Sequence, residues 1–198
     1  MANYDFPDIC PNETEWGLLT NTRSHTSPLT GAVTTSGRRG TRWFTRMTFT
    51  NLRDDQRREL QAHLVRLNGQ THRSMLFDWS YQASYGAGGG ANVNGGGQTG
   101  STLNIFPSAN WGRNGDYFLL NGELKMITDD FGSGAATQVS FTPPLRTAPP
   151  DGALLSQSRP MRIPMILIGN DTSWANQPDT SLNNSATFSV EFVEDINL

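Results

Sequence analysis

The sequence predicts a mainly β protein, with a β-barrel or sandwich core, one packed α-helix and an inserted small β-barrel-like unit. The chain of 198 residues contains 20 Gly and 11 Pro, and only 17% of its residues are charged. This composition suits short strands joined by many turns. Apolar and polar residues alternate in several segments, and only one segment has helical periodicity.

The helical segment is residues 54–68. Asp54 and Asp55 lie in its first turn, where negative charge suits the helix dipole, and Gly69 follows as a natural residue beyond the C-cap. The apolar face consists of three leucines spaced at i, i+4 and i+7: Leu60, Leu64 and Leu67. We therefore expect this helix to pack its leucines onto the core.

Four segments alternate as half-buried strands: residues 41–50, 74–79, 161–168 and 186–194. In each of them apolar residues recur at alternate positions and are expected to face the core. The inward residues would be Trp43, Met47 and Phe49; Met75, Phe77 and Trp79; Ile163, Met165 and Leu167; and Phe188, Val190 and Phe192. Because Pro164 lacks an N–H, the third segment is expected at a sheet edge or at a bulge.

The middle of the chain has a different pattern. Residues 85–100 hold eight glycines and are expected to form a flexible loop that buries no face. Strands are predicted at 102–106 and 137–141, and a hairpin at 116–128 turns at Asn121-Gly122. We expect residues 87–158, with this Gly-rich entry loop, to form a unit inserted into a core domain of residues 1–86 and 159–198.

Charge and cysteine content exclude several classes. The net charge of −3 and pI near 5.5 argue against binding to the outside of duplex DNA. Cys10 is the single cysteine, so no intramolecular disulfide is possible, and a half-buried free thiol is expected. The three histidines, His25, His63 and His72, lack metal-ligand spacing, so no metal site is predicted.

No catalytic constellation is found in the sequence. There is no G-x-S-x-G motif, and no Ser or Cys has a nearby His in a recognisable catalytic pattern. Asp129 and Asp130 fit a solvated turn, and Glu191, Glu194 and Asp195 fit an exposed strand face that runs into a tail. We expect no catalytic residues, no cofactor and no enzymatic activity.

Basic residues are unevenly distributed. Nine arginines lie between positions 38 and 73: Arg38, Arg39, Arg42, Arg46, Arg53, Arg57, Arg58, Arg66 and Arg73. Lys125 is the only lysine. An Arg-rich, Lys-poor chain is compatible with extensive protein–protein contact, although ordinary surface arginines explain it equally well.

The N-terminus has no signal-peptide pattern, and the longest apolar run, residues 165–168, is too short for a membrane segment.

Several short motifs, taken in order, resemble one family. They are Trp16, residues 27–31 (SPLTG), 37–43 (GRRGTRW), 47–52 (MTFTNL), 64–70 (LVRLNGQ), 75–78 (MLFD), 98–100 (QTG), Leu103, Trp111, 115–116 (GD) and 143–146 (PPLR). From about Trp16 to Trp174 their order and spacing are similar to those of distal tail proteins, the tail-tip or baseplate hub ring proteins of long-tailed bacteriophages.

The resemblance implies a structural virion protein that forms a hexameric ring at the distal end of the tail, assembled in the host cytoplasm. The tail tube protein would lie above the ring, and the tip hub and receptor-binding or fibre proteins below it. DNA would pass through the channel without specific binding. In this family a peripheral inserted domain is common, and residues 87–97 would serve here as a hinge or an intersubunit arm.

Other functions remain open at this point. Exposed aromatic residues of the inserted unit, such as Trp111, Tyr117 and Phe118, would stack on sugars in a carbohydrate- or receptor-binding module, unless they fill the core of that unit. A tail tube or terminator component with a related fold is a second alternative. A cell-wall hydrolase is a third.

Overall fold

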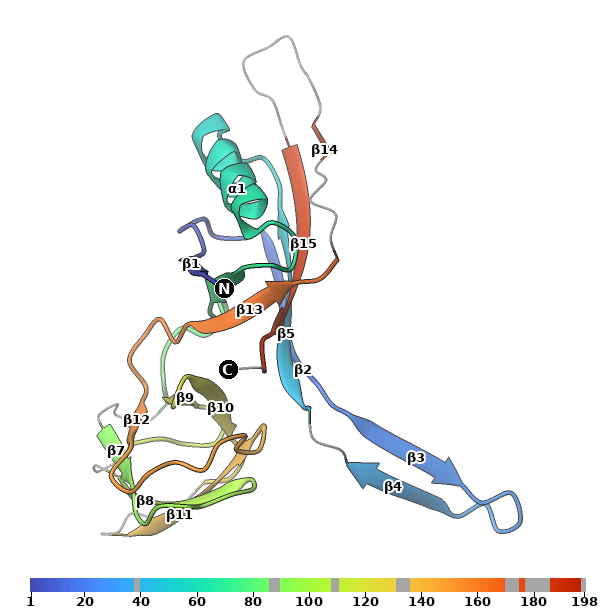
Figure 1. Cartoon of the computed structure of the whole chain (residues 1–198), viewed down its shortest axis with the longest axis vertical. Helices are drawn as coiled ribbons and strands as arrows, with labels where there is room; N and C mark the ends of the chain where they lie inside the picture. Colours follow the sequence, from blue (N-terminus) through green and yellow to red (C-terminus); the bar gives the residue numbers. More distant parts are fainter. Residues whose placement is uncertain are drawn as a thin grey trace. The chain divides into compact units, whose positions relative to one another are not determined.

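The computed structural model describes residues 1–37, 40–85, 90–107, 111–130, 136–169, 175–176 and 186–196. The described part is mainly β with one α-helix, as the sequence predicts. Contacts divide the chain into two compact units, which Figure 1 draws: unit 1 is Met1–Trp79 with Pro164–Leu198, and unit 2 is Ser80–Ile163. The sequence placed the boundaries of the inserted unit at 87 and 158, whereas the contacts place them at 80 and 163.

Unit 1 is built on a curled sheet with strand order β1-β6-β13-β15-β5-β2, and β14 pairs with β15. Strands β3 and β4 form a separate two-stranded sheet. The elements are β1 (Asn3–Asp5), β2 (Glu13–Leu19), β3 (Thr22–Thr26), β4 (Val33–Gly37), β5 (Arg42–Phe49), α1 (Asp54–Leu67), β6 (Arg73–Leu76), β13 (Ile163–Leu167), β14 (Ala175–Asn176) and β15 (Ala186–Glu194).

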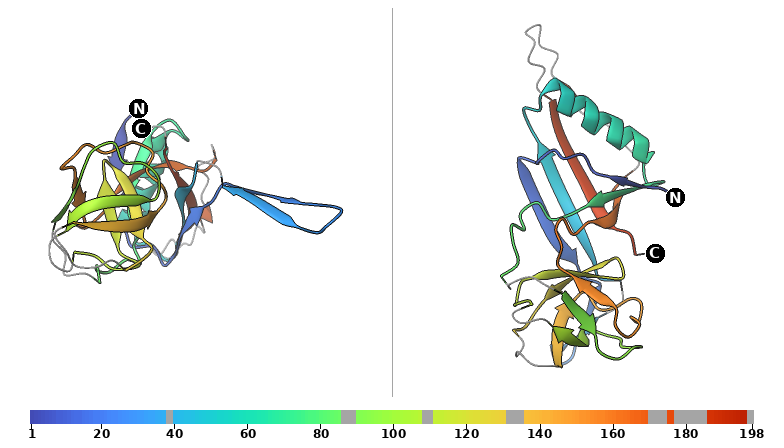
Figure 2. Two further views of the ribbon diagram at one scale, coloured as in Figure 1. Left: turned by 90° about the horizontal axis from the view of Figure 1, so that it is seen from below. Right: turned by 90° about the vertical axis from the view of Figure 1, so that its left-hand side faces the viewer.

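The inner face of the sheet carries the apolar residues that the alternation of β5, β13 and β15 predicts. They are Trp43, Met47, Phe49, Ile163, Met165, Leu167, Phe188, Val190 and Phe192, all of them buried. Figure 2 shows α1 lying along this sheet, with Leu60, Leu64 and Leu67 buried as expected. Phe6 joins the two layers, because its ring contacts His63 of α1 and both Phe49 and Phe192 of the sheet.

Unit 1 differs from the sequence-based expectations at two places. Strand β13 lies between β6 and β15, so of the two positions expected for Pro164, an edge or a bulge, the edge is excluded. Pro164 is tolerated there because the paired residues of β13 and β15 begin one position later, at Met165. Strand β6 ends at Leu76, and its core-facing residues are Ser74 and Leu76, since both are buried and Ser74 bonds to His63. The residues expected to face inward, Met75, Phe77 and Trp79, are only half-buried.

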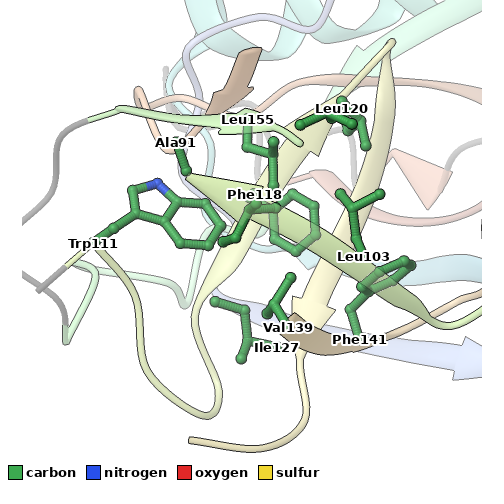
Figure 3. Close-up of a cluster of buried hydrophobic side chains, with 11 residues drawn as sticks. Ala91, Leu103, Trp111, Phe118, Leu120, Ile127, Val139, Phe141 and Leu155 are labelled. Carbon is green, nitrogen blue, oxygen red and sulfur yellow. The ribbon is translucent and has the colours of Figure 1, made fainter. Parts of the chain in front are cut away.

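Unit 2 contains a closed barrel with strand order β10-β11-β8-β7-β12-β9. Its strands are β7 (Gly90–Val93), β8 (Thr102–Pro107), β9 (Tyr117–Leu120), β10 (Glu123–Ile127), β11 (Thr137–Thr142) and β12 (Leu154–Ser156). Figure 3 shows side chains from several strands directed into one interior, with Phe118 between Trp111 and Phe141. These rings, with leucine, isoleucine and valine side chains, make the barrel a packed core.

The Gly-rich segment differs from the expected flexible loop. Ala91 and Val93 of β7 are buried in the barrel, so part of the segment does bury a face. The turn that follows is held by Gln98, whose amide nitrogen donates to the Asn94 and Gly95 carbonyls. Small residues fit here because β7 lies between β8 and β12. The prediction that residues 87–97 form a hinge or an arm is therefore wrong for residues 90–97, while residues 86–89 lie outside the described ones.

The hairpin that joins β9 to β10 has the predicted turn. Asn121 and Gly122 both have positive φ, 52° and 80°. Two consecutive residues of this kind match the right-handed twist of the flanking strands, and Asn and Gly adopt them at the lowest cost. The two strands pair from Leu120↔Glu123 to Tyr117↔Met126, and Phe118 and Leu120 of β9 are buried in the barrel core.

We expect Phe118→Ala to lower the free energy of unfolding of the barrel by about 3–5 kcal/mol, because it removes a ring at the centre of the packed core. Phe106→Ala is the matched control, since the Phe106 side chain on β8 is 49% exposed. Urea unfolding followed by circular dichroism measures both variants. Equal losses of stability in the two variants would contradict the described packing.

Candidate interaction surface

Several side chains of unit 1 whose types occur in active sites are buried, and they form hydrogen bonds or ion pairs within the protein. The His63 imidazole lies 2.9 Å from the Ser74 hydroxyl, and both side chains are buried. Arg73 forms a buried ion pair with Asp195, and the Glu194 carboxylate accepts a hydrogen bond of 3.0 Å from the backbone N–H of Trp43. The prediction that Glu194 and Asp195 lie on an exposed face is therefore wrong, because both side chains are buried.

Unit 2 has a buried ion pair of its own. The Lys125 ammonium lies 2.6 Å from the Glu123 carboxylate and donates to the Pro144 carbonyl at 2.8 Å. Glu123 also accepts the backbone N–H groups of Arg146 and Thr147. The pair ties β10 to the segment that follows β11, and the Lys125 side chain is fully buried. The single lysine is thus part of the packed interior of the barrel.

Asp116 fixes the segment that enters the barrel. Its buried carboxylate accepts hydrogen bonds from the Ser84 hydroxyl at 2.8 Å, from the Tyr85 backbone N–H at 2.7 Å and from the Arg113 backbone N–H at 2.9 Å. The Tyr81 hydroxyl donates to the same carboxylate, and burial together with this negative charge raises the pKa of Tyr81. This arrangement orders the segment and serves structure.

The other candidate catalytic or metal-binding residues of the sequence do not lie together in one site. His72 accepts a hydrogen bond from the Ala2 backbone N–H, and His25 lies on exposed β3. Cys10 is exposed, not half-buried as expected, and Asp129 and Asp130 lie in an exposed turn as expected. Within the residues that the structure describes, no three His, Cys, Asp or Glu side chains are grouped to hold a metal ion, and no helix has the length and apolarity to cross a membrane.

The outer face of the unit 1 sheet carries a row of ions across three strands. Arg46 of β5 pairs with Glu15 of β2 at 3.1 Å and with Glu191 of β15 at 2.6 Å. The carboxylate of Glu191 raises the pKa of the Arg46 guanidinium. Two carboxylates face one guanidinium, and exposed Glu13 lies two residues from Glu15 on the same side of β2. This end of the sheet is therefore acidic.

Strand β2 ends the sheet and pairs only with β5 in the described part of the chain. Gly17 is needed there: a Cβ at this position would lie 2.5 Å from the Phe44 ring, which crosses β2 on the outer face. An edge strand of seven residues presents unpaired N–H and C=O groups along its free side. The edge is thus available to another strand.

The hairpin of β3 and β4, which we call the arm (residues 22–37), is the second open surface. The two strands pair from Thr22↔Gly37 to Thr26↔Val33, and Figure 1 draws them as a separate ribbon pair. Residues 20–36 are exposed, apart from half-buried Ser27. No face of the arm is packed within the described residues, so both of its edges and faces are open to a partner.

The tip of the arm is well formed. Ser27 and Ala32 are joined by a backbone hydrogen bond of 2.9 Å, and the Gly31 N–H donates to the Ser27 carbonyl at 2.9 Å. Gly31 has a φ of +68°, which suits glycine. Leu29 is left 95% exposed at the end of the turn. The arm therefore ends in an exposed apolar side chain.

Sequence reasoning missed both surfaces. The alternation of Glu13 and Glu15 with Thr14 and Trp16 was a signal for β2, and the β-branched residues on either side of residues 27–31 were a signal for the arm. The aromatic residues that it considered for sugar binding, Trp111, Tyr117 and Phe118, are buried in unit 2. No family model and no curated protein matches the chain.

The buried imidazole predicts a pH dependence of stability. Burial, with a smaller contribution from Arg66, lowers the pKa of His63 from 6.5 to about 4. The unfolded chain therefore binds the imidazole proton more tightly than the folded chain does. The contribution of neutral His63 to the free energy of unfolding is complete above about pH 6.5 and is lost as the pH falls toward about 4. We expect His63→Gln to flatten the unfolding free energy between these pH values in urea titrations. An unchanged slope would contradict the burial of a neutral imidazole.

The barrel ion pair predicts a strong effect of removing one partner. Lys125→Met leaves the Glu123 carboxylate buried without its counter-ion and should destabilise unit 2 by about 3–5 kcal/mol. Arg46→Met is the matched control, because its ion pairs are exposed and its removal should change stability little. Chemical unfolding compares the two variants, and a mild effect of Lys125→Met would show that the ammonium is hydrated.

Proposed function

We propose that the protein is a non-enzymatic structural subunit of a bacteriophage tail tip, which forms a hexameric ring at the distal end of the tail. The ring continues the DNA channel below the tail tube and provides a platform for the tip hub and for receptor-binding or fibre proteins. The mature protein is a virion component, assembled in the host cytoplasm. The sequence motifs from Trp16 onward supply the family to which this proposal refers.

The observation that carries the proposal is the exposed arm beside a sheet whose last strand, β2, has a free edge. A two-stranded hairpin without a packed face is at best marginally stable in water. A long free edge is also a surface that monomeric proteins usually protect. In a subunit that assembles with further chains, a partner chain can cover both the arm and the free edge of β2.

The buried polar groups support the non-enzymatic part. His63, Ser74, Arg73 and Asp195 are buried in unit 1, and the ion pair of unit 2 is buried as well. A general base or nucleophile has to reach a substrate. The groups named above serve instead as internal hydrogen-bond and ion-pair partners.

The charge of the chain agrees with a DNA channel. A ring through which a genome slides should not hold the phosphates with a basic lumen. The formal net charge of −3 satisfies this requirement for the subunit as a whole. Specific DNA binding is therefore no part of the proposal.

The alternatives predict different behaviour. Another tail component, such as a tube or terminator protein, would share the assembly surfaces but would stack or cap rings at another position in the tail. A carbohydrate-binding module loses the support of Trp111, Tyr117 and Phe118, because these three side chains are buried. The tail-tip ring therefore remains the first candidate.

Negative-stain electron microscopy with a mass measurement tests the proposal on the purified full chain. We expect rings with a central channel and a mass of about 131 kDa, six times the subunit mass of 21.8 kDa. The central channel distinguishes a ring from a compact aggregate of the same mass. A monodisperse species of one subunit mass at high protein concentration would contradict it.

A further inference from the structure

The arm is a formed hairpin that lacks a partner in the described part of its own chain. Its strands carry β-branched residues, such as Val33, Thr34 and Thr35, which favour pairing in a sheet. The arm gains no stability from a packed face, so its pairing partner has to come from outside the hairpin. Strand β4 holds no charged residue, and charge is the usual means of protecting an edge. We take β4 as the strand most suited to accept another edge.

The charge of this region limits what the partner can be. The segment from 20 to 41 holds three of the 15 basic residues, at positions 23, 38 and 39, and none of the 18 acidic residues. The rest of the chain therefore has a formal charge of −6. Two arms brought together would repel each other, whereas an arm and an acidic surface would attract.

An acidic surface with a free strand edge is present on unit 1. Glu13 and Glu15 lie on the exposed side of β2, and Glu191 follows across the sheet, with Arg46 as the only cation in this row. Arg42 lies at the other end of β5, opposite Leu19. The end of β2 near Glu13 therefore combines negative charge with unpaired backbone groups, which are the two properties that the arm requires.

The arm cannot easily reach this end within its own subunit. β3 begins at Thr22, shortly after β2 ends at Leu19, whereas Glu13 lies at the opposite end of β2. Seven residues of extended strand span about 20 Å. The arm would have to fold back along the strand that leads into it, while a second subunit meets no such obstacle.

We propose that the arm of one subunit docks on the acidic edge of β2 in a second copy of the chain, with β4 adding to the sheet and Arg23 near Glu13. This contact joins different surfaces on the two subunits, so it is heterologous, and repeating it generates a ring when the rotation closes. The inference rests on the proposed function as a self-assembling subunit and names the surfaces by which it assembles.

Charge reversal tests the contact on the full chain. We expect Arg23→Glu and Glu13→Lys each to raise the protein concentration needed for half-assembly by about tenfold or more, because each places like charges in contact. An equimolar mixture of the two variants should regain part of the lost assembly, since a reversed arm then meets a reversed edge. Arg113→Glu on unit 2 and Glu59→Lys on α1 are the matched controls and should assemble as the unchanged protein does. Sedimentation velocity over a range of concentrations measures the four variants, the mixture and the unchanged protein.

A second variant keeps the test independent of single charges. Replacing residues 22–37 by a short Gly-Ser linker should give a subunit that unfolds at the unchanged temperature and stays monomeric. An unchanged protein that assembles while the armless variant assembles equally well would overturn the arm contact and leave the ring intact. Loss of assembly in the armless variant without any effect of Glu13→Lys would overturn the β2 edge as the docking site. An unchanged protein that never assembles would overturn the ring and the contact together.

Discussion

The pairing of β15 with β5 on one side and β13 on the other holds unit 1 together. β5 comes from the first third of the chain and β15 from its end, and six residue pairs join them, from Phe188↔Phe49 to Val193↔Phe44. The buried ion pair of Arg73 with Asp195 joins the same two parts of the chain. The sheet of unit 1 therefore needs strands that precede the barrel in the sequence and strands that follow it. The barrel can be inserted into unit 1 because it has a closed sheet and a hydrophobic core of its own.

The distribution of polar groups follows from this construction. Each unit closes without a disulfide, since the chain has one cysteine. Buried hydrogen bonds and ion pairs instead fix the places where segments distant in sequence meet, as His63 does with Ser74 and Lys125 with Glu123. Groups used in this way contribute to a unique fold and are withdrawn from the surface. Open strand edges and charged side chains lie on the surface, where another chain can contact them.

The sequence predicted the elements whose signal is local. The helix, the β9–β10 hairpin and the faces of β5, β13 and β15 depend on periodicity or turn chemistry within a few residues, and the structure confirms them. It misassigned elements whose environment is set by distant partners. Ser74 faces the core because His63 lies opposite, and Ala91 and Val93 form a strand in spite of the surrounding glycines because β8 and β12 flank them. The candidate surface was missed for the same reason, since an edge is defined only when all other strands have been placed.

Assembly through the arm requires that the arm gains a partner, and amide hydrogen exchange read by mass spectrometry measures this directly. Backbone amides of a hairpin that is exposed on both faces should exchange almost as fast as those of an unfolded peptide in the dilute subunit. We expect the peptides covering residues 22–37 and 13–19 to become protected together as the protein concentration rises and rings form. Rapid exchange of residues 22–37 at every concentration, including conditions in which rings are visible, would contradict the account.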